Sequence, residues 1–194
     1  MAQVLVLMSS PRKNGNTDRL ANAFIKGVEE NGYSTEKIYV NYQNIKSCLG
    51  CNICQKTNQC VQKDDMQEIY EKMLEAKVIV FASTVYFYTF NASMKLLLDR
   101  TCTFAIEKTI HDKDFYLLST GLAPDESYFR IIKETFQKYI DCLRVGGNRF
   151  VDSILGFQTG DKDDIEKTDS IEKAYNMAKE IKINESKFNC LFFT

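Results

Sequence analysis

The sequence predicts an α/β fold of three layers, in which a doubly wound parallel sheet of five strands carries helices on both faces. Short apolar runs alternate with longer amphipathic stretches along the chain, which is the order of strands and helices that such a fold needs. The runs are apolar at nearly every position rather than at every second one, as in residues 78–82. Strands of this kind are buried on both faces, as they are in a parallel sheet covered by helices.

The predicted elements follow one another in strict alternation. Strand-forming runs, rich in β-branched and aromatic residues, occur at residues 4–8, 35–40, 78–82, 115–118 and 150–157. Each is followed by a stretch with the apolar spacing of a helix, at residues 17–30, 65–74, 91–103, 126–143 and 171–181. Turn-forming residues support these boundaries: Asn31-Gly32 closes the first helix, Gly146-Gly147-Asn148 follows the fourth, and the polar segment 160–164 precedes the last.

The length and composition predict one main domain. A chain of 194 residues with 44% apolar residues has enough material for one sizeable core. We expect a domain over residues 1–183 with a cysteine-rich insertion at residues 47–63. Residues 184–194 form an apolar tail after a polar hinge, which we expect to dock either on the chain's own core or on a second subunit.

The charge balance excludes some partners. Acidic and basic residues nearly cancel to a net charge of -1, so no basic field exists to gather nucleic acid or anionic lipid. Residues 1–8 lack the basic start and the cleavage site of a signal peptide, and no apolar run approaches the roughly 18 residues of a membrane span. We therefore expect a cytoplasmic protein with no nucleic-acid and no membrane partner.

Four of the seven cysteines form a dense run, Cys48, Cys51, Cys54 and Cys60, with the spacing C-x2-C-x2-C-x5-C. Two-residue gaps let successive thiolates turn toward one centre, as in the runs that hold cubane iron-sulfur clusters, although the proline that follows such runs in bacterial ferredoxins is missing. Zinc and redox-active or free thiols are the alternatives. The odd number of cysteines argues against a disulfide framework. The isolated cysteines are expected to be ordinary packing residues: Cys102, Cys142 and Cys190.

The first predicted strand runs into the segment Ser-Ser-Pro-Arg-Lys-Asn-Gly-Asn-Thr at residues 9–17, directly before a helix. Hydroxyls and backbone amides therefore gather at a helix N-terminus, which favours an anion, and Gly15 allows a tight turn. Arg12 or Lys13 adds positive charge. The segment lacks both the G-x-x-x-x-G-K-S/T of nucleoside triphosphatases and the G-x-G-x-x-G of dinucleotide sites, which favours a single phosphate such as that of FMN. The alternative is a helix cap beside a solvated basic turn.

An aromatic loop follows the third predicted strand. Tyr86, Phe87 and Tyr88 lie where a flat ring would need walls, and the loop amides could bind the polar edge of a flavin. The alternative is that these rings pack under neighbouring helices. After the fourth strand, Ser119-Thr120-Gly121 adds hydroxyls and a flexible turn at the same edge of the sheet.

Together these segments resemble the flavodoxin-like NAD(P)H-dependent FMN reductase family. Its first motif, S-S-P-R-x-x-G-N-T, matches residues 9–17, and its second, S-P-V-Y-F-x4-A-x2-K-x3-D-R, matches residues 83–100 with only the proline replaced, by Thr84. The resemblance spans about residues 3–160 and implies that FMN is the cofactor. The residues implied for its phosphate are Ser9, Ser10, Arg12, Asn14, Asn16 and Thr17. Those implied for its ring and the adjoining crevice are Ser83, Thr84, Val85, Tyr86, Phe87, Tyr88, Thr120 and Gly121.

The cysteine insertion, followed by Asp64-Asp65-Met66, is similar to the iron-sulfur flavoprotein branch of that family. In that branch the four cysteines bind a 4Fe–4S cluster that exchanges single electrons with FMN across a subunit interface. The resemblance implies an oxidoreductase that passes electrons from NAD(P)H or a reduced carrier through FMN to a small-molecule acceptor or a ferredoxin-like carrier, in a homodimer or homotetramer. No side chain is required as a catalytic acid or nucleophile. The alternatives are an FMN-binding electron carrier or redox sensor, and a zinc-stabilised binding module without flavin.

Other polar residues are interpreted as structural. His111, the single histidine, is expected in a solvated loop, and residues 161–164 are expected to form a polar turn rather than a cation site. Lys95, Asp99 and Arg100 are expected to form an ion-pair network that holds their helix. Its core residues are predicted to be Met94, Leu96, Leu97 and Leu98.

Overall fold

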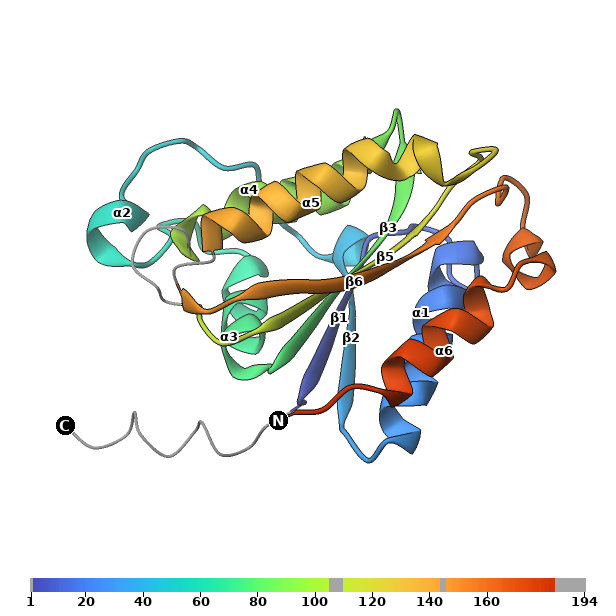
Figure 1. The fold of residues 1–194 in the computed structure, drawn as a ribbon. Coiled ribbons are helices and arrows are strands. Elements are labelled where there is room, and N and C mark those ends of the chain that lie inside the picture. The colour runs from blue at the N-terminus through green and yellow to red at the C-terminus, as the bar shows by residue number, and fades with distance from the viewer. Residues whose placement is uncertain (1, 105–109, 144–145, 184–194) are drawn as a thin grey trace.

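The computed structural model describes residues 2–104, 110–143 and 146–183 and shows the three expected layers (Figure 1). In this part of the chain, five parallel strands form the sheet in the order β2-β1-β3-β5-β6. They are β1 (Val4–Met8), β2 (Thr35–Tyr39), β3 (Val78–Tyr86), β5 (Asp114–Thr120) and β6 (Arg149–Gly156). A short sixth strand, β4 (Thr89–Phe90), pairs antiparallel with the end of β3. The five-stranded parallel sheet is confirmed, and β4 is an addition within the predicted aromatic loop.

Helices cover both faces of the sheet. On one face α1 (Asn16–Glu30) and α6 (Ser170–Lys179) lie side by side (Figure 1). On the other lie α3 (Met66–Glu75), α4 (Ala92–Arg100) and α5 (Arg130–Leu143). Strand β1 contributes to both layers, because Val6 packs into the core beneath α1 and α6 whereas Leu7 packs into the opposite core. Successive side chains of a strand point to opposite faces, so a strand buried on both sides has to be apolar throughout.

Two of the predicted helices each consist of a longer helix and a short helical turn. The predicted helix 91–103 is α4 followed by η2 (Thr101–Phe104), and the predicted helix 126–143 is η3 (Glu126–Phe129) followed by α5. The other short turns are η1 (Val40–Tyr42), α2 (Cys54–Thr57) and η5 (Asp164–Lys167). No helix within the described ranges is long and apolar enough to cross a membrane.

Three expectations about the chain's organisation stay predictions: the docking of the tail, the division at residue 183 and the insertion at residues 47–63. The apolar tail at residues 184–194 lies outside the described residues. The division of the chain at residue 183 and the status of residues 47–63 as an insertion into one domain are likewise proposals. Core predictions for the helix after β3 are confirmed, because Met94, Leu97 and Leu98 are buried and Leu96 packs partly buried against the same core.

The register of the strands brings their carboxyl ends to one edge of the sheet. Ser83 of β3 pairs with Ser119 of β5, Thr84 pairs with Thr120, and Thr120 pairs with Gly156 of β6. The strand order reverses between β1 and β3, because the chain extends from β1 toward β2 on one side and toward β3, β5 and β6 on the other. Doubly wound sheets bind ligands outside this edge at such a switch point.

Candidate functional site

A cavity of about 470 Å³ opens at the carboxyl edge of the sheet. Its volume lies within the range of small-molecule sites. Most of the residues predicted to contact a cofactor line this cavity: Ser10, Arg12, Asn16, Thr17, Thr84, Val85, Tyr86, Phe87, Tyr88, Thr120 and Gly121. The loops after β1, β3 and β5 therefore converge as their places at the ends of the strands predict.

Three predicted residues do not line the cavity. The Ser9 hydroxyl is buried and donates to the Ala82 carbonyl oxygen at 3.3 Å. The Ser83 hydroxyl is also buried and donates to the Thr84 carbonyl oxygen. Asn14 has a positive φ of 58°, and its amide donates to the Asp18 carboxylate at 2.8 Å. These side chains shape the loops that carry the lining residues.

The start of α1 has features that favour a bound anion. Its N-cap, Gly15, has no side chain, so no side chain caps the first helical amides. A Cβ on Gly15 would lie 2.9 Å from Arg12 Cβ, so only glycine fits this tight turn, in which the Gly15 amide donates to the Arg12 carbonyl oxygen. Uncapped amides and the helix dipole attract negative charge, and Arg12 lines the same space.

Asn16 fixes the loop that follows β6. Its amide nitrogen donates to the carbonyl oxygens of Thr159 (3.2 Å) and Asp161 (2.7 Å), and its amide oxygen accepts from the Ile165 amide. This loop brings Thr159 and Gly160 to the cavity wall. The side chain of Asn16 is therefore engaged with the protein itself.

Three threonine hydroxyls meet at the floor of the cavity. Thr17 Oγ1 lies 2.6 Å from Thr120 Oγ1 and 3.0 Å from Thr84 Oγ1, so one residue of α1 is joined to the ends of β3 and β5. Each hydroxyl supplies one proton and two hydrogen bonds join the three, so one proton is left to donate elsewhere. Thr84 stands where the family motif has proline, which has neither this hydroxyl nor an amide proton.

An exposed aromatic hairpin forms one wall of the cavity. Phe87 and Tyr88 connect β3 and β4 and both have positive φ, 49° and 68°. Tyr88 stacks on Tyr128 of η3 with ring centroids 5.8 Å apart and planes 16° apart. Phe87 is 97% exposed and the Tyr86 and Tyr88 rings are about half exposed, so the three rings are not packed under a neighbouring helix. That they border a flavin ring stays a prediction.

Some lining residues were not predicted from the sequence. The segment after Gly121 contributes Leu122 and Ala123, and η3 contributes Tyr128. Their local sequence carries no phosphate or ring motif. The signal that could have found them is their position after a strand that ends at the switch point.

The cysteine run forms a second, smaller site. Cys48, Cys51, Cys54 and Cys60 line one cavity of about 70 Å³. Cys48 and Cys51 are exposed, whereas Cys54 and Cys60 are partly buried. Among the described residues, no group of three or more histidine, cysteine or acidic side chains is arranged closely enough to hold a metal ion. The four thiols thus share a pocket, and their donor chemistry fits a thiolate-bound metal or cluster, but the structure does not assemble them into a ligand set.

Cys102 lines the same small cavity, which the sequence did not indicate. Burial, followed by the charges of Cys102 and the three other thiols of the run, raises the pKa of Cys54. The expectation that the isolated cysteines are packing residues is wrong for Cys102 and Cys142, because both are exposed. Cys190 lies outside the described residues.

The remaining polar predictions have mixed outcomes. Lys95 and Asp99 form the expected ion pair at 2.6 Å, but the expected network with Arg100 is wrong, because Arg100 turns into the protein and pairs with Asp64. His111 lies in an exposed turn beside Asp112, as expected. Residues 161–164 form a polar turn at the start of η5, held by the Asp161 amide donating to the Asp164 carboxylate.

Comparison with known proteins places this geometry in a family. Residues 2–130 match the family of NADPH-dependent FMN reductases. The chain is 34% identical over 107 residues to an iron-sulfur flavoprotein of Archaeoglobus fulgidus, covering 55% of this chain and 49% of the relative. It is 29% identical over 187 residues to an iron-sulfur flavoprotein of Methanocaldococcus jannaschii, covering 92% and 95%. The chain therefore spans about half the length of the first relative and nearly all of the second.

Solved structures share the fold at low sequence identity. An azoreductase from Bacillus anthracis superposes with a TM-score of 0.71 at 14% identity, covering 93% of this chain and all of that one (100%). An NAD(P)H:quinone oxidoreductase from Methanothermobacter marburgensis gives a TM-score of 0.71 at 17% identity and covers 93% and 99%. These likenesses confirm the flavodoxin-like, doubly wound architecture.

Proposed function

The chain belongs to the NADPH-dependent FMN reductase family, and from this membership we propose that it is an FMN-dependent oxidoreductase that passes electrons from NAD(P)H or a reduced carrier to an acceptor. The observation that carries the proposal is the cavity at the switch point. This cavity brings together an uncapped helix N-terminus, buried hydroxyls and an aromatic wall. The residues that form these three features lie within the part of the chain that matches the family.

The residues of the cavity divide into two groups. The amides at the start of α1, with Ser10, Arg12 and the Thr17 hydroxyl, would hold the phosphate of FMN. The segment from Thr84 to Tyr88, with Tyr128, would border the ring. Bound FMN would accept a hydride from NAD(P)H and release the electrons to the acceptor. The protein's contribution is to orient this cofactor and to limit the access of water to it, without a side chain acting as acid or nucleophile.

The cysteine pocket supports a second redox site. We propose that Cys48, Cys51, Cys54 and Cys60 bind a 4Fe–4S cluster, which would make ferredoxin-like carriers suitable donors or acceptors. The support is the spacing of the run, the shared cavity and the relatives named iron-sulfur flavoproteins. With zinc or free thiols instead, quinones, nitroaromatics and other small acceptors would fit better.

Apolar side chains exposed at the rim of the cavity proposed to bind FMN, here called the flavin cavity, support a homo-oligomer. Phe87 is 97% exposed and Leu122 is 83% exposed, and both line the cavity rim. Apolar side chains exposed together at a site mark contact with a ligand or another chain. We propose that a second subunit covers this rim in a homodimer or homotetramer. The alternative function, a carrier or sensor that binds FMN without substrate turnover, needs the same cavity.

One experiment separates these functions. Protein purified without oxygen is analysed for FMN, iron and zinc, and its oxidation of NADH and NADPH is followed with an artificial acceptor. Sustained turnover with about one FMN per chain supports the reductase. FMN without turnover supports the carrier or sensor, and failure to bind FMN would overturn both. Iron near four per chain supports the cluster, and zinc or no metal contradicts it.

A further inference from the structure

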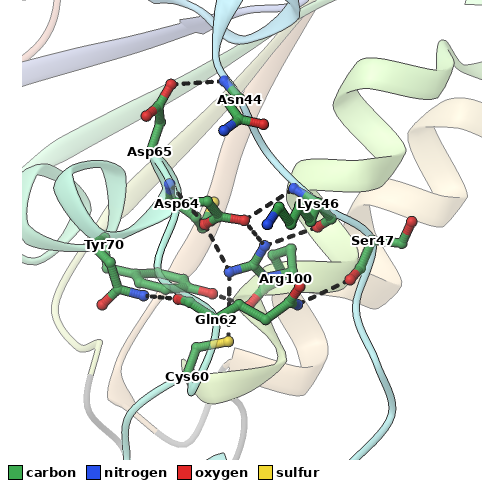
Figure 2. A network of polar contacts seen from close by, with 11 residues as sticks. Asn44, Lys46, Ser47, Cys60, Gln62, Asp64, Asp65, Tyr70 and Arg100 are labelled. Carbon is green, nitrogen blue, oxygen red and sulfur yellow. Dashed lines mark hydrogen bonds and ion pairs between the residues drawn. The ribbon is translucent and has the colours of Figure 1, made fainter.

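Arg100 lies at the end of α4 and points into the base of the cysteine insertion (Figure 2). Its side chain is 1% exposed, and that of its partner Asp64 is fully buried at 0%. The pair is bidentate: Arg100 Nη1 donates to Asp64 Oδ2 at 2.6 Å, and Nη2 donates to Oδ1 at 3.0 Å. A buried pair of this kind is destabilising when one partner is removed, because the other charge is left uncompensated.

The electrostatics of the pair keep both groups ionised. Burial alone would raise the pKa of Asp64, but its hydrogen bonds from Arg100 and from the Lys46 amide outweigh burial, and the pKa is lowered. Burial alone would lower the pKa of Arg100, but the hydrogen bonds to Asp64 and the neighbouring charges raise it. A permanent positive charge is therefore held inside the protein beside the cysteine loop.

This pair closes the two ends of the cysteine insertion. On the incoming side, Arg100 Nη1 donates to the Lys46 carbonyl oxygen at 2.8 Å, and the Lys46 amide donates to Asp64 Oδ2 at 3.0 Å. On the outgoing side, the Met66 amide donates to Asp64 Oδ1 at 3.2 Å. Further across, Gln62 donates to the Ser47 carbonyl oxygen at 2.9 Å (Figure 2). The ends of the loop are thus joined through the guanidinium and its carboxylate.

The same guanidinium reaches one cysteine. Arg100 Nη2 donates to Cys60 Sγ at 3.5 Å, and both residues line the thiol cavity. All four Nη hydrogens therefore have acceptors on the loop or at its ends, while the buried Nε has no partner within the described residues. The Arg100 backbone is fixed in turn, because the Tyr70 hydroxyl donates to its carbonyl oxygen at 2.7 Å.

We propose that Arg100 is a positioning residue of the cysteine site, which closes the loop at residues 47–63 and holds the Cys60 sulfur toward the other thiols. This inference rests on the proposed metal site, and it gives Arg100 a role that the spacing of the cysteines does not indicate. The planar fork is essential to it, because a lysine ammonium cannot reach the carboxylate, the Lys46 carbonyl and the sulfur in one geometry. A donor to sulfur also draws charge from it, which favours the reduced form of a bound cluster.

The first arm of the test uses the metal-free protein and amide hydrogen exchange. In Arg100→Lys, exchange at the Lys46 and Met66 amides should speed up at least about tenfold, because charge-assisted bonds that close the loop are lost. Cys60→Ser should leave these amides at wild-type rates, because the sulfur does not close the loop. Arg149→Lys is the control, since it alters a bidentate pair with Asp114, and neither residue lines the thiol cavity.

The second arm measures iron after anaerobic reconstitution with ferrous iron and sulfide. Arg100→Lys should retain less than half of the wild-type iron and give any remaining cluster a more negative reduction potential. Its FMN content should stay at the wild-type level, because Arg100 does not line the flavin cavity. If Arg100→Lys does not fold, Asp64→Asn has to reproduce the faster exchange and the iron loss.

The two proposals fail in different ways. If the wild-type protein takes up no iron, the proposed cluster is overturned. The hydrogen-exchange rates of the metal-free protein still test the positioning role of Arg100. Wild-type exchange rates in both Arg100→Lys and Asp64→Asn overturn the positioning role. The positioning role is also overturned if the wild-type protein binds iron and Arg100→Lys binds the same amount at the same reduction potential.

Discussion

The hydroxyl oxygens of Thr17 and Thr120 lie 2.6 Å apart, which ties the first turn of α1 to the end of β5. Both residues line the cavity and are almost completely buried. The position of the helix N-terminus relative to the sheet therefore depends on a polar contact inside the proposed flavin site. A substitution that weakens this contact should therefore lower the affinity for the phosphate of FMN.

We expect Thr17→Val to raise the dissociation constant for FMN by about tenfold or more, which corresponds to the loss of roughly one to two hydrogen bonds. Titration of the apoprotein by quenching of flavin fluorescence measures the change. Thr35→Val is the control, because its hydroxyl contacts Glu29 and does not line the cavity. Equal affinity in both variants would mean that the Thr17 hydroxyl takes no part in binding.

Phe87 combines exposure with a backbone conformation that an aromatic residue rarely adopts, φ of 49°. Phe87→Gly should raise the free energy of unfolding of the monomeric unit by about 1 kcal/mol, because glycine adopts this φ without strain. Phe87→Ala removes the ring but keeps a Cβ, so it should not give this gain. Both should weaken self-association alike, measured by light scattering, if the ring contacts a second subunit. Unchanged mass in both variants would exclude this contact.

Gly27 sets the distance between α1 and α6. A Cβ there would overlap the Tyr175 carbonyl oxygen and lie 2.8 Å from Ala178 Cβ. We expect Gly27→Ala to lower the free energy of unfolding by about 2 kcal/mol through overpacking, although alanine favours helices. Chemical denaturation measures the change, with Glu71→Ala at an exposed position of α3 as control. A gain in stability would show that the two helices separate without cost.

Lys113 is buried near the ends of the strands opposite the cavity, and its Nζ donates to the carbonyl oxygens of Leu74 and Ala76 at 2.5 Å each. Burial, with a contribution from the charge of Lys77, lowers the pKa of Lys113 from 10.5 to about 8. Between these two values the unfolded chain binds more protons than the folded one. The contribution of Lys113 to stability should therefore rise with pH across this window, by at most about 3 kcal/mol.

Comparison of the wild-type protein with Lys113→Met isolates this contribution. The difference in unfolding free energy between the two should shift in favour of the wild type as the pH rises from about 8 toward 10. Lys138→Met, at an exposed site, should show no such shift. Parallel pH profiles for wild type and Lys113→Met would contradict the lowered pKa of Lys113.

The sheet could be predicted because its cause is local. A strand buried on two faces, such as β1, must be apolar at every position, and that pattern is visible in five consecutive residues. The hairpin of β3 and β4 could not be predicted, because the residues at its turn are Phe87 and Tyr88 rather than the glycine and asparagine that usually take positive φ.

The contacts between distant segments were the harder part of the site. The motif at residues 9–17 indicates a phosphate loop, but nothing in it shows that the Asn16 side chain is engaged by Thr159 and Asp161. The sequence predicts an ion-pair network of Lys95, Asp99 and Arg100, but only Lys95 and Asp99 have the (i, i+4) spacing of helical neighbours. The real partner of Arg100, Asp64, is 36 positions away in sequence and is brought near only when α3 and α4 pack on the same face.

Helix α4 begins next to the loop at residues 9–17 and ends at the base of the cysteine loop. Its N-cap, Asn91, accepts from the Met94 amide and donates to the Ser9 carbonyl oxygen beside the phosphate loop, and its last residue is Arg100. Its 9 residues give a rigid spacer about 14 Å long. Insertion or deletion of one residue would turn Arg100 by about 100° and shift it by about 1.5 Å relative to the flavin loop. The length of this helix therefore fixes the distance between the cavity at the sheet edge and the base of the cysteine loop, and the helix should tolerate substitutions on its exposed side but no change in length.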